Sequence, residues 1–223
     1  MVEVAAREVK ALRDATGAGM MDAKRALVDA NGDHEAAAQA LREKGLAKAA
    51  GRSDRDNTEG AIGLAFTTDR AALVHLRCET DFSAKSEGFV SLVDDLASAV
   101  LEEGEGAPEA RTAALDDLRL STKENVEVGR VALTEAATDN LIDAYLHRQD
   151  GRGVNGVIVE ASGVDQETLH QIALHIAFAK PTALSRDEVA PDLVEAERAA
   201  LLDITKAEGK PEPAWDKIVE GHL

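Results

Sequence analysis

Two β-type runs followed by an apolar helical segment occur twice in this chain, and this repetition constrains the fold more than any other feature. In the first copy, the runs at 61–66 and 71–78 flank the polar turn 67–70, which is a hairpin signal. Apolar residues then recur at helical spacing over 89–100, which predicts an amphipathic helix. A hairpin covered by a helix is typical of an α+β fold.

The second copy has the same order of elements. Residues 141–147 and 154–161 are β-type runs around the turn 149–153, and apolar residues at helical spacing follow over 169–177. The two copies match by residue class and not by identity. They predict two structurally related hairpin-plus-helix subdomains within one α+β fold.

The first 45 residues predict three short helices separated by glycines. We expect these helices at 5–15, 21–30 and 35–44. Asp33 can cap the third helix, and Gly45 is expected to close it. Three helices of this size form a compact bundle, and its lack of catalytic residues suggests a docking module.

The end of the chain predicts a helical hairpin. Residues 192–208 and 213–220 are helical and charged, and the glycine and prolines at 209–213 separate them. The chain therefore divides into a three-helix docking module at 1–45, a linker at 46–59, a first core subdomain at 60–139, a second at 140–181 and a helical hairpin extension at 182–223. Three further elements are expected in the first subdomain: an exposed loop at 102–108, a helix at 109–118 and a strand at 126–133.

Composition limits the compartment and the core. Hydrophobic residues make up 44% of the chain and aromatic residues only 3%, so the core is expected to be aliphatic. The single cysteine, Cys78, cannot form an internal disulfide, which fits a reducing compartment. No apolar run is long enough to span a membrane, and residues 1–4 do not begin a basic-then-apolar signal sequence. These features predict a cytoplasmic protein that does not contact membranes.

The net charge of −17 is distributed unevenly. Residues 1–56 are balanced, with 10 basic and 10 acidic side chains, whereas residues 57–223 carry 15 basic and 32 acidic ones. Such an acidic body repels phosphate backbones, so we expect no direct nucleic-acid partner. A protein partner with a basic or mixed surface fits the charge, and so does acidity that serves solubility alone. The sequence leaves a homodimer open.

The reactive residues form no convincing catalytic or metal-binding group. His75 and Cys78 are three positions apart in one predicted strand, so their side chains are expected on opposite faces. His170 and His175 are five positions apart on a predicted helix, which does not match a helical zinc pair. No phosphate-binding loop or paired-cysteine motif is present. We therefore predict no catalytic residue, no metal ligand and no cofactor.

Two short segments admit both a structural and a functional interpretation. Consecutive helical residues point about 100° apart, so Met20 and Met21 cannot both lie in so small a core. One is then an incidental exposed residue, or both belong to a protein-binding surface. The segment Thr80-Asp81-Phe82 follows a β run. It is either a capped turn whose Phe82 packs on the helix entry, or a loop that presents a carboxylate beside an exposed aromatic side chain.

Two longer motifs resemble the signatures of the bacterial elongation factor Ts family. Residues 9–27, VKALRDATGAGMMDAKRAL, resemble the N-terminal signature of the family, and residues 78–85, CETDFSAK, resemble its second signature. The spacing between the two motifs also fits. Further similarity at 145–147, 176–181 and 208–221 extends the resemblance along nearly the whole chain.

The resemblance implies a factor that binds the GTPase elongation factor Tu and expels its GDP. The N-terminal bundle would be similar to a ubiquitin-associated domain and would dock on the GTPase domain. The residues implied in that docking are Leu12, Met20 and Met21, and the hairpin at His147 would lie toward another domain of the partner. The residues implied in disturbing the Mg²⁺ site of the partner are Thr80, Asp81, Phe82 and Ser83, with Phe82 inserted as a wedge.

Two departures from the family pattern bear on the implied site and on the second subdomain. Ser83 stands where the family usually has valine, which predicts a looser rim around the wedge. The family also continues beyond the region of 219–221 with further strands, whereas this sequence stops at Leu223. Either this member is naturally short, or its second subdomain is incomplete and relies on another chain.

Two alternatives to an exchange factor remain at this stage. The first is a non-exchanging interaction scaffold that keeps the docking module and has lost exchange through C-terminal shortening. The second is a small hydrolase that uses Cys78 as a nucleophile, for which the sequence offers no nearby base.

Overall fold

The computed structural model describes residues 4–223. The interpretation of residues 1–4 as lacking a signal sequence therefore lies largely outside the described residues. Contacts divide the chain into two compact units, and the boundary along the chain falls between Phe178 and Ala179.

The first unit begins with the three expected helices, α1 (Ala6–Thr16), α2 (Met20–Asp29) and α3 (His34–Ala50). Gly17 ends α1 with a φ of 64°, a conformation that favours glycine. The Asp33 carboxylate caps α3 by accepting hydrogen bonds from two backbone amides, as expected. The bundle core consists of small and aliphatic residues: Val9, Leu12, Ala23, Leu27 and Ala37.

The prediction that Gly45 closes the third helix is wrong. Helix α3 passes through Gly45 and ends at Ala50, so the connection to the sheet begins at Gly51. A Cβ atom added to Gly45 would lie 2.3 Å from Leu120 Cδ2. The glycine therefore permits a close contact with another helix within an uninterrupted α3, and it does not stop α3.

The first predicted hairpin is confirmed and belongs to a three-stranded antiparallel sheet. Strands β1 (Glu59–Phe66) and β2 (Arg70–Cys78) pair around the expected turn, and β3 (Glu127–Glu135) pairs with the other edge of β2. Alternate residues of β2 are buried, which brings Cys78 into the core and leaves His75 on the opposite face.

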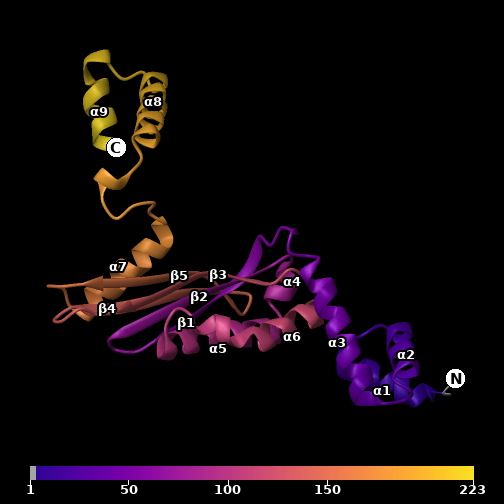
Figure 1. Ribbon diagram of the computed structural model, residues 1–223. Helices are drawn as coiled ribbons and strands as arrows, with labels where there is room; N and C mark the ends of the chain where they lie inside the picture. The colour runs from indigo at the N-terminus through magenta and orange to yellow at the C-terminus, as the bar shows by residue number, and fades with distance from the viewer. Residues whose placement is uncertain (1–3) are drawn as a thin grey trace. The chain divides into compact units, whose positions relative to one another are not determined.

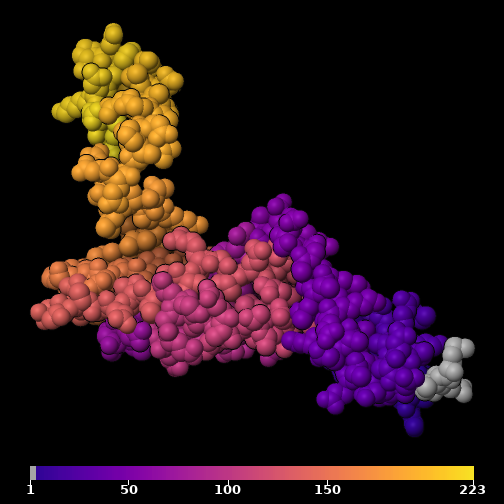
Figure 2. Space-filling view, viewed as in Figure 1, coloured from indigo at the N-terminus to yellow at the C-terminus, as the bar shows by residue number. Residues whose placement is uncertain are grey.

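Two helices cover one face of this sheet. The long helix α5 (Glu87–Glu103) packs against β1 and β2, and α6 (Thr112–Thr122) follows a short 3₁₀ helix, η1 (Ala107–Arg111). The segment predicted as an exposed loop is only partly one, because Ala107 and Pro108 are buried. In Figure 2 the space-filled side chains of α5 and α6, in magenta and pink, form a continuous cover.

The second hairpin and its helix are also confirmed. Strands β4 (Leu141–Gln149) and β5 (Arg152–Ala161) pair antiparallel, and their turn residues Asp150 and Gly151 both have positive φ values. Helix α7 (Gln166–Ala179) packs on one face of this pair through an apolar cluster that includes Val157, Val159 and Leu169.

The two sheets stack face to face. A Cβ atom added to Gly156 of β5 would lie 2.7 Å from Leu73 Cδ2 of β2, while the neighbouring Val157 faces α7. The layers are therefore α7, the β4–β5 pair, the three-stranded sheet, and α5 with α6 (Figure 1). Both predicted core subdomains lie in one compact unit, so their division at residue 139 stays a prediction.

The second unit contains the predicted helical hairpin. Helix α8 (Pro191–Ala207) follows a 3₁₀ turn, η2 (Arg186–Glu188). A second 3₁₀ turn, η3 (Glu212–Ala214), leads into α9 (Trp215–His222), and α9 packs against α8. Gly209, at φ 71°, ends α8, and Trp215 Nε1 donates a hydrogen bond to the carbonyl of Lys210 at 2.8 Å. Across residues 4–223, none of the helices has the length and apolarity to cross a bilayer.

The close approach of β1 to α5 makes Gly63 a sensitive position. A Cβ atom there would lie 2.3 Å from the backbone oxygen of Val93, which cannot rotate away. We expect Gly63→Ala to lower the free energy of unfolding by about 3 kcal/mol.

Gly88 of α5 has nothing within 4 Å of such a Cβ atom. The matched variant Gly88→Ala should change the same free energy by less than about 1 kcal/mol. Urea denaturation followed by circular dichroism compares the two, and equal stabilities would contradict the described packing.

Candidate functional site

The segment Thr80–Ser83 forms a tight turn between β2 and the single-turn helix α4 (Asp81–Ala84). Thr80 Oγ1 caps this helix by accepting a hydrogen bond from the Ser83 amide at 3.3 Å. The capped-turn interpretation of the segment is therefore right in its first half. Its second half is wrong, because Phe82 does not pack on the helix entry: its side chain is 84% exposed.

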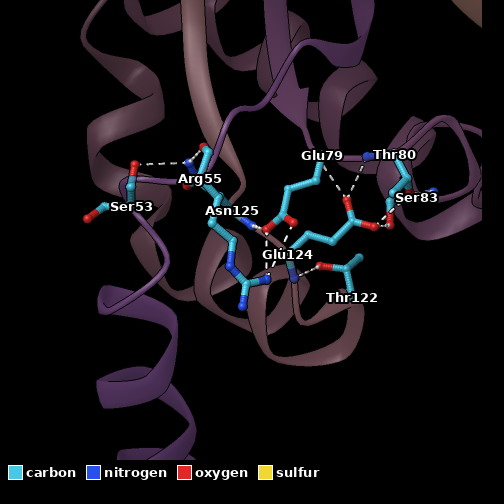
Figure 3. A network of polar contacts seen from close by, with 8 residues as sticks. All are labelled: Ser53, Arg55, Glu79, Thr80, Ser83, Thr122, Glu124 and Asn125. Atoms are coloured by element: carbon cyan, nitrogen blue, oxygen red, sulfur yellow. Dashed lines mark hydrogen bonds and ion pairs between the residues drawn. The ribbon is translucent and has the colours of Figure 1, made fainter.

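The Glu124 carboxylate accepts hydrogen bonds from several groups of this turn (Figure 3). Its Oε2 atom accepts hydrogen bonds from the amides of Glu79 and Thr80 at 3.0 and 3.1 Å. Its Oε1 atom accepts hydrogen bonds from the hydroxyls of Thr80 and Ser83, both at 2.6 Å. One side chain thus binds the backbone and both hydroxyls of a segment more than 40 residues earlier in the chain.

A second carboxylate, that of Glu79, binds back from the turn to the segment that follows α6. The Glu79 side chain accepts a hydrogen bond from the Asn125 amide at 2.7 Å and lies 3.3 Å from an Arg55 nitrogen. The buried Asn125 side chain in turn donates to the carbonyls of Ser53 and Arg55. Segments 53–55, 79–83 and 122–125 are therefore joined in one polar network (Figure 3).

The charge of Glu124 is stabilised by its donors. Partial burial alone would raise its pKa, but the hydrogen bonds from Ser83, Thr80 and the backbone favour the ionised form more strongly, so its pKa is lowered from the usual 4.5. The carboxylate is therefore ionised at neutral pH and available as an acceptor.

The outer side of the turn carries an ion-pair chain. Lys85 Nζ lies 2.8 Å from Asp81 Oδ2 and 3.3 Å from Asp150 Oδ2 in the turn between β4 and β5. The hydrogen bond from Lys85 lowers the pKa of Asp81. Lys85 therefore connects the second hairpin to the segment that presents Phe82.

Cys78 is not placed as a nucleophile. Its buried thiol donates a weak hydrogen bond to the Thr80 carbonyl at 3.2 Å, and burial raises its pKa to about 11. At neutral pH the group is thus a protonated thiol. His75 lies on the opposite face of β2, as predicted, where burial lowers its pKa. The hydrolase interpretation has no support from this geometry.

The two methionines of the docking module are both on the surface. Met20 is 46% exposed and Met21 is 69% exposed at the start of α2, so the interpretation in which one of them is buried is wrong. Leu12 differs from them, because it is 2% exposed in the core of the bundle. Its burial does not fit direct contact with a partner, so any effect of Leu12 on docking would act through the packing of the bundle.

The remaining residue singled out from the sequence, His147, is exposed near the end of β4. Its Nδ1 atom lies 3.2 Å from the Tyr145 hydroxyl. A second histidine, His170 of α7, lies 2.8 Å from the buried Asp143 carboxylate. In the part of the chain from 4 to 223, no group of three or more His, Cys, Asp or Glu residues is arranged to hold a metal ion.

Sequence reasoning missed Glu124, Asn125 and Lys85. The hydrogen-bond partners of Glu124 lie 41–45 residues away, so no local pattern marks it. Lys123 ends α6 in the left-handed region at φ 60°, but a lysine does not mark such a position in the sequence.

Comparison with known proteins gives consistent matches. A family model described as elongation factor TS matches residues 79–223. The elongation factor Ts of Cutibacterium acnes is 43% identical over 233 residues, covering 99% of this chain and 83% of that protein. The elongation factor Ts of Clavibacter michiganensis is 41% identical over 235 residues, covering 100% of this chain and 84% of that protein. The elongation factor Ts of a Ruegeria species is 40% identical over 230 residues, covering 99% of this chain and 78% of that protein.

The lowered pKa of Glu124 makes its contribution to stability depend on pH. Because the folded pKa lies below the unfolded value, this contribution is present above the unfolded pKa and is lost as pH falls through the folded pKa. We expect Glu124→Gln to lower the free energy of unfolding by about 1–2 kcal/mol at neutral pH. The difference from the unmodified protein should shrink below about pH 4.

Urea denaturation across this pH range measures the difference. The control is Glu102→Gln, which changes an exposed carboxylate of α5. A Glu124→Gln effect that stays constant down to low pH would contradict an ionised anchor.

Proposed function

The chain belongs to the elongation factor Ts family and is a translation elongation factor, and on this premise we propose that it binds elongation factor Tu and promotes GDP release by disturbing the Mg²⁺ site of that GTPase. We further infer that it acts in the cytoplasm, where such a partner would be found.

One observation carries the proposal: a largely exposed aromatic side chain stands on a turn held by a network of hydrogen bonds. Phe82 contributes almost nothing to the core, since its side chain is 84% exposed. The turn beneath it is nevertheless fixed by the Glu124 carboxylate and by the Thr80 cap. A large apolar side chain kept in water on an ordered support is typical of a residue that inserts into a partner.

The mechanism requires no covalent chemistry. Mg²⁺ binds phosphates through a near-ideal octahedral set of oxygens, so small displacements of its ligands weaken nucleotide binding. Phe82 would insert beside that site, and the Asp81 carboxylate would lie next to it. If this factor favours the displaced arrangement and GDP with Mg²⁺ favours the other, each weakens the binding of the other by the same factor.

The exposed pair Met20 and Met21 fits the docking contact. Methionine side chains are flexible and polarisable, and they are suited to apolar protein surfaces. Docking through this surface at the start of α2 would hold the partner while the turn at Phe82 acts on its nucleotide site. His147, near the end of β4, is a candidate for a contact with another domain of the same partner.

The direct test is the rate at which elongation factor Tu releases a fluorescent GDP, with and without this protein. The proposal expects faster release, and an unchanged rate would overturn it. A binding measurement made alongside separates the alternative, because a scaffold that keeps only the docking module would bind without accelerating release.

For the wedge, we expect Phe82→Ala to lower the maximal rate of stimulated GDP release by at least about tenfold, the scale of one large apolar contact. Its affinity for elongation factor Tu should change by less than about threefold, since most of the docking surface remains. Titration of release rate against factor concentration separates the two parameters.

Phe178→Ala is the matched control, because Phe178 is equally exposed (88%) near the end of α7 and has no assigned role. It should leave both parameters unchanged. A Phe82→Ala variant that loses affinity and exchange by the same factor would be evidence against a wedge.

For the docking surface, we expect the double variant Met20→Asp/Met21→Asp to weaken binding to elongation factor Tu by at least about 100-fold, because two carboxylates would be buried without partners. Both side chains are exposed, so the isolated protein should stay folded. Isothermal titration measures binding, and circular dichroism checks the fold.

The control changes two exposed positions of α8, as Leu193→Asp/Ile204→Asp. Equal binding by the two double variants would exclude this surface.

A further inference from the structure

We propose that Glu124 is a positioning residue of the exchange site: its carboxylate holds residues 79–83 in the one conformation that presents Phe82 and Asp81 outward. This inference rests on the proposed function for its consequence in exchange. Its structural part, that the turn depends on Glu124, can be tested without any partner.

The turn cannot maintain this conformation alone. Helix α4 has only four residues, which is far below the length at which an isolated helix is stable in water. Burial also contributes little, because within α4 only Ala84 is buried while Phe82 faces solvent. Its conformation therefore has to come from polar contacts with a more stable part of the fold.

Glu124 supplies those contacts. Each carboxylate oxygen already accepts two hydrogen bonds from the turn, which uses most of its capacity as an acceptor. The Thr80 hydroxyl donates to Glu124 and accepts from the Ser83 amide, so it transmits the anchor to the first turn of α4. Both carboxylate oxygens are directed at the turn, so we infer that Glu124 acts on a partner through the turn.

The segment that carries Glu124 is itself fixed by contacts with the rest of the fold. Glu124 follows the end of α6, and its neighbour Asn125 is fixed by the Glu79 carboxylate and by the carbonyls of Ser53 and Arg55. The contacts on the outer side of the turn are weaker. Lys85 and its acidic partners are substantially exposed, and exposed ion pairs contribute little. Glu124 is therefore the principal support of the turn.

Ser83 gains a role from this arrangement. The hydroxyl at this position donates a 2.6 Å hydrogen bond to Glu124, which a valine could not make. Serine therefore adds a polar attachment at the place where the sequence led us to expect a looser rim.

The first experiment measures amide hydrogen exchange in the free protein by NMR. In Glu124→Ala, the amides of Glu79, Thr80 and Ser83 should exchange at least about tenfold faster, as expected for lost hydrogen bonds to a charged acceptor. Glu124→Gln keeps an acceptor oxygen and should fall between this variant and the unmodified protein. If Glu124→Ala does not fold, Ser83→Ala removes one of the four hydrogen bonds and should accelerate the same amides to a smaller extent.

The matched control is Glu160→Ala. The Glu160 carboxylate of β5 also holds a loop, by accepting from the Ala137 amide at 2.8 Å and from the Asn140 side chain at 2.7 Å. This variant should accelerate exchange at Ala137 and leave residues 79–83 unchanged. If Glu124→Ala and Glu160→Ala affected residues 79–83 equally, or if neither did, the proposed anchor would be wrong.

The second experiment asks whether the anchor acts through Phe82. Glu124→Ala should lower the maximal rate of stimulated GDP release about tenfold, while the factor concentration at half-maximal rate changes by less than about threefold. The double variant Glu124→Ala/Phe82→Ala should be no slower than Phe82→Ala alone. Additive losses would show that Glu124 acts by another route and would overturn the inference.

Failure of the proposed function gives a different result. In that case the unmodified protein does not accelerate GDP release, whereas the amide exchange rates still report whether Glu124 holds the turn. Unchanged amide exchange in Glu124→Ala overturns the positioning role whatever the release rates are.

Discussion

The hydrogen bonds that the Glu124 carboxylate accepts determine how the turn at residues 79–83 presents Phe82 to solvent. Glu124 binds two backbone amides and two hydroxyls of the turn at residues 79–83, each of which is at least partly exposed. Charged acceptors form stronger hydrogen bonds than neutral ones, and partial burial limits competition from water. The turn therefore stays ordered although its largest side chain, Phe82, contributes nothing to the core. Glu124 and Phe82 divide the two tasks, because Glu124 holds the turn and Phe82 is the side chain that would insert into a partner.

The layered fold brings the parts of this network together. Strand β2 delivers Glu79 and Thr80 at its carboxyl end, and α6 and the residues after it deliver Glu124 on the way into β3. Because β3 pairs with β2, the segments that lead out of β2 and into β3 lie at the same end of the sheet. The stacked β4–β5 hairpin places Asp150 near Lys85 on the outer side. The central feature of the site thus depends on antiparallel pairing across a gap of more than 40 residues.

Local signals predicted much of the fold, and contacts distant in sequence account for the errors. The two hairpins, the helices after them and the Asp33 cap were predictable, because turn chemistry and periodicity act over a few residues. The end of α3 was misplaced because Gly45 meets Leu120, which no local pattern shows. At the site, Thr80 was recognisable as a cap, but Glu124 was not, since its partners are close only after β3 pairs with β2. Local reasoning left the exposure of Phe82 undecided, because an aromatic side chain beside a helix can pack on the helix entry or be presented to a partner.

The central claim is that the exposed turn acts on the Mg²⁺ site of a GTPase partner, and its dependence on Mg²⁺ tests this claim most directly. The measurement is the ratio of GDP release rates from elongation factor Tu with and without this protein, across a range of free Mg²⁺ concentrations. The account predicts that this ratio is large at high Mg²⁺ and falls toward one as Mg²⁺ is removed, because a chelator then does what the turn does. A ratio that is independent of Mg²⁺ would contradict the account.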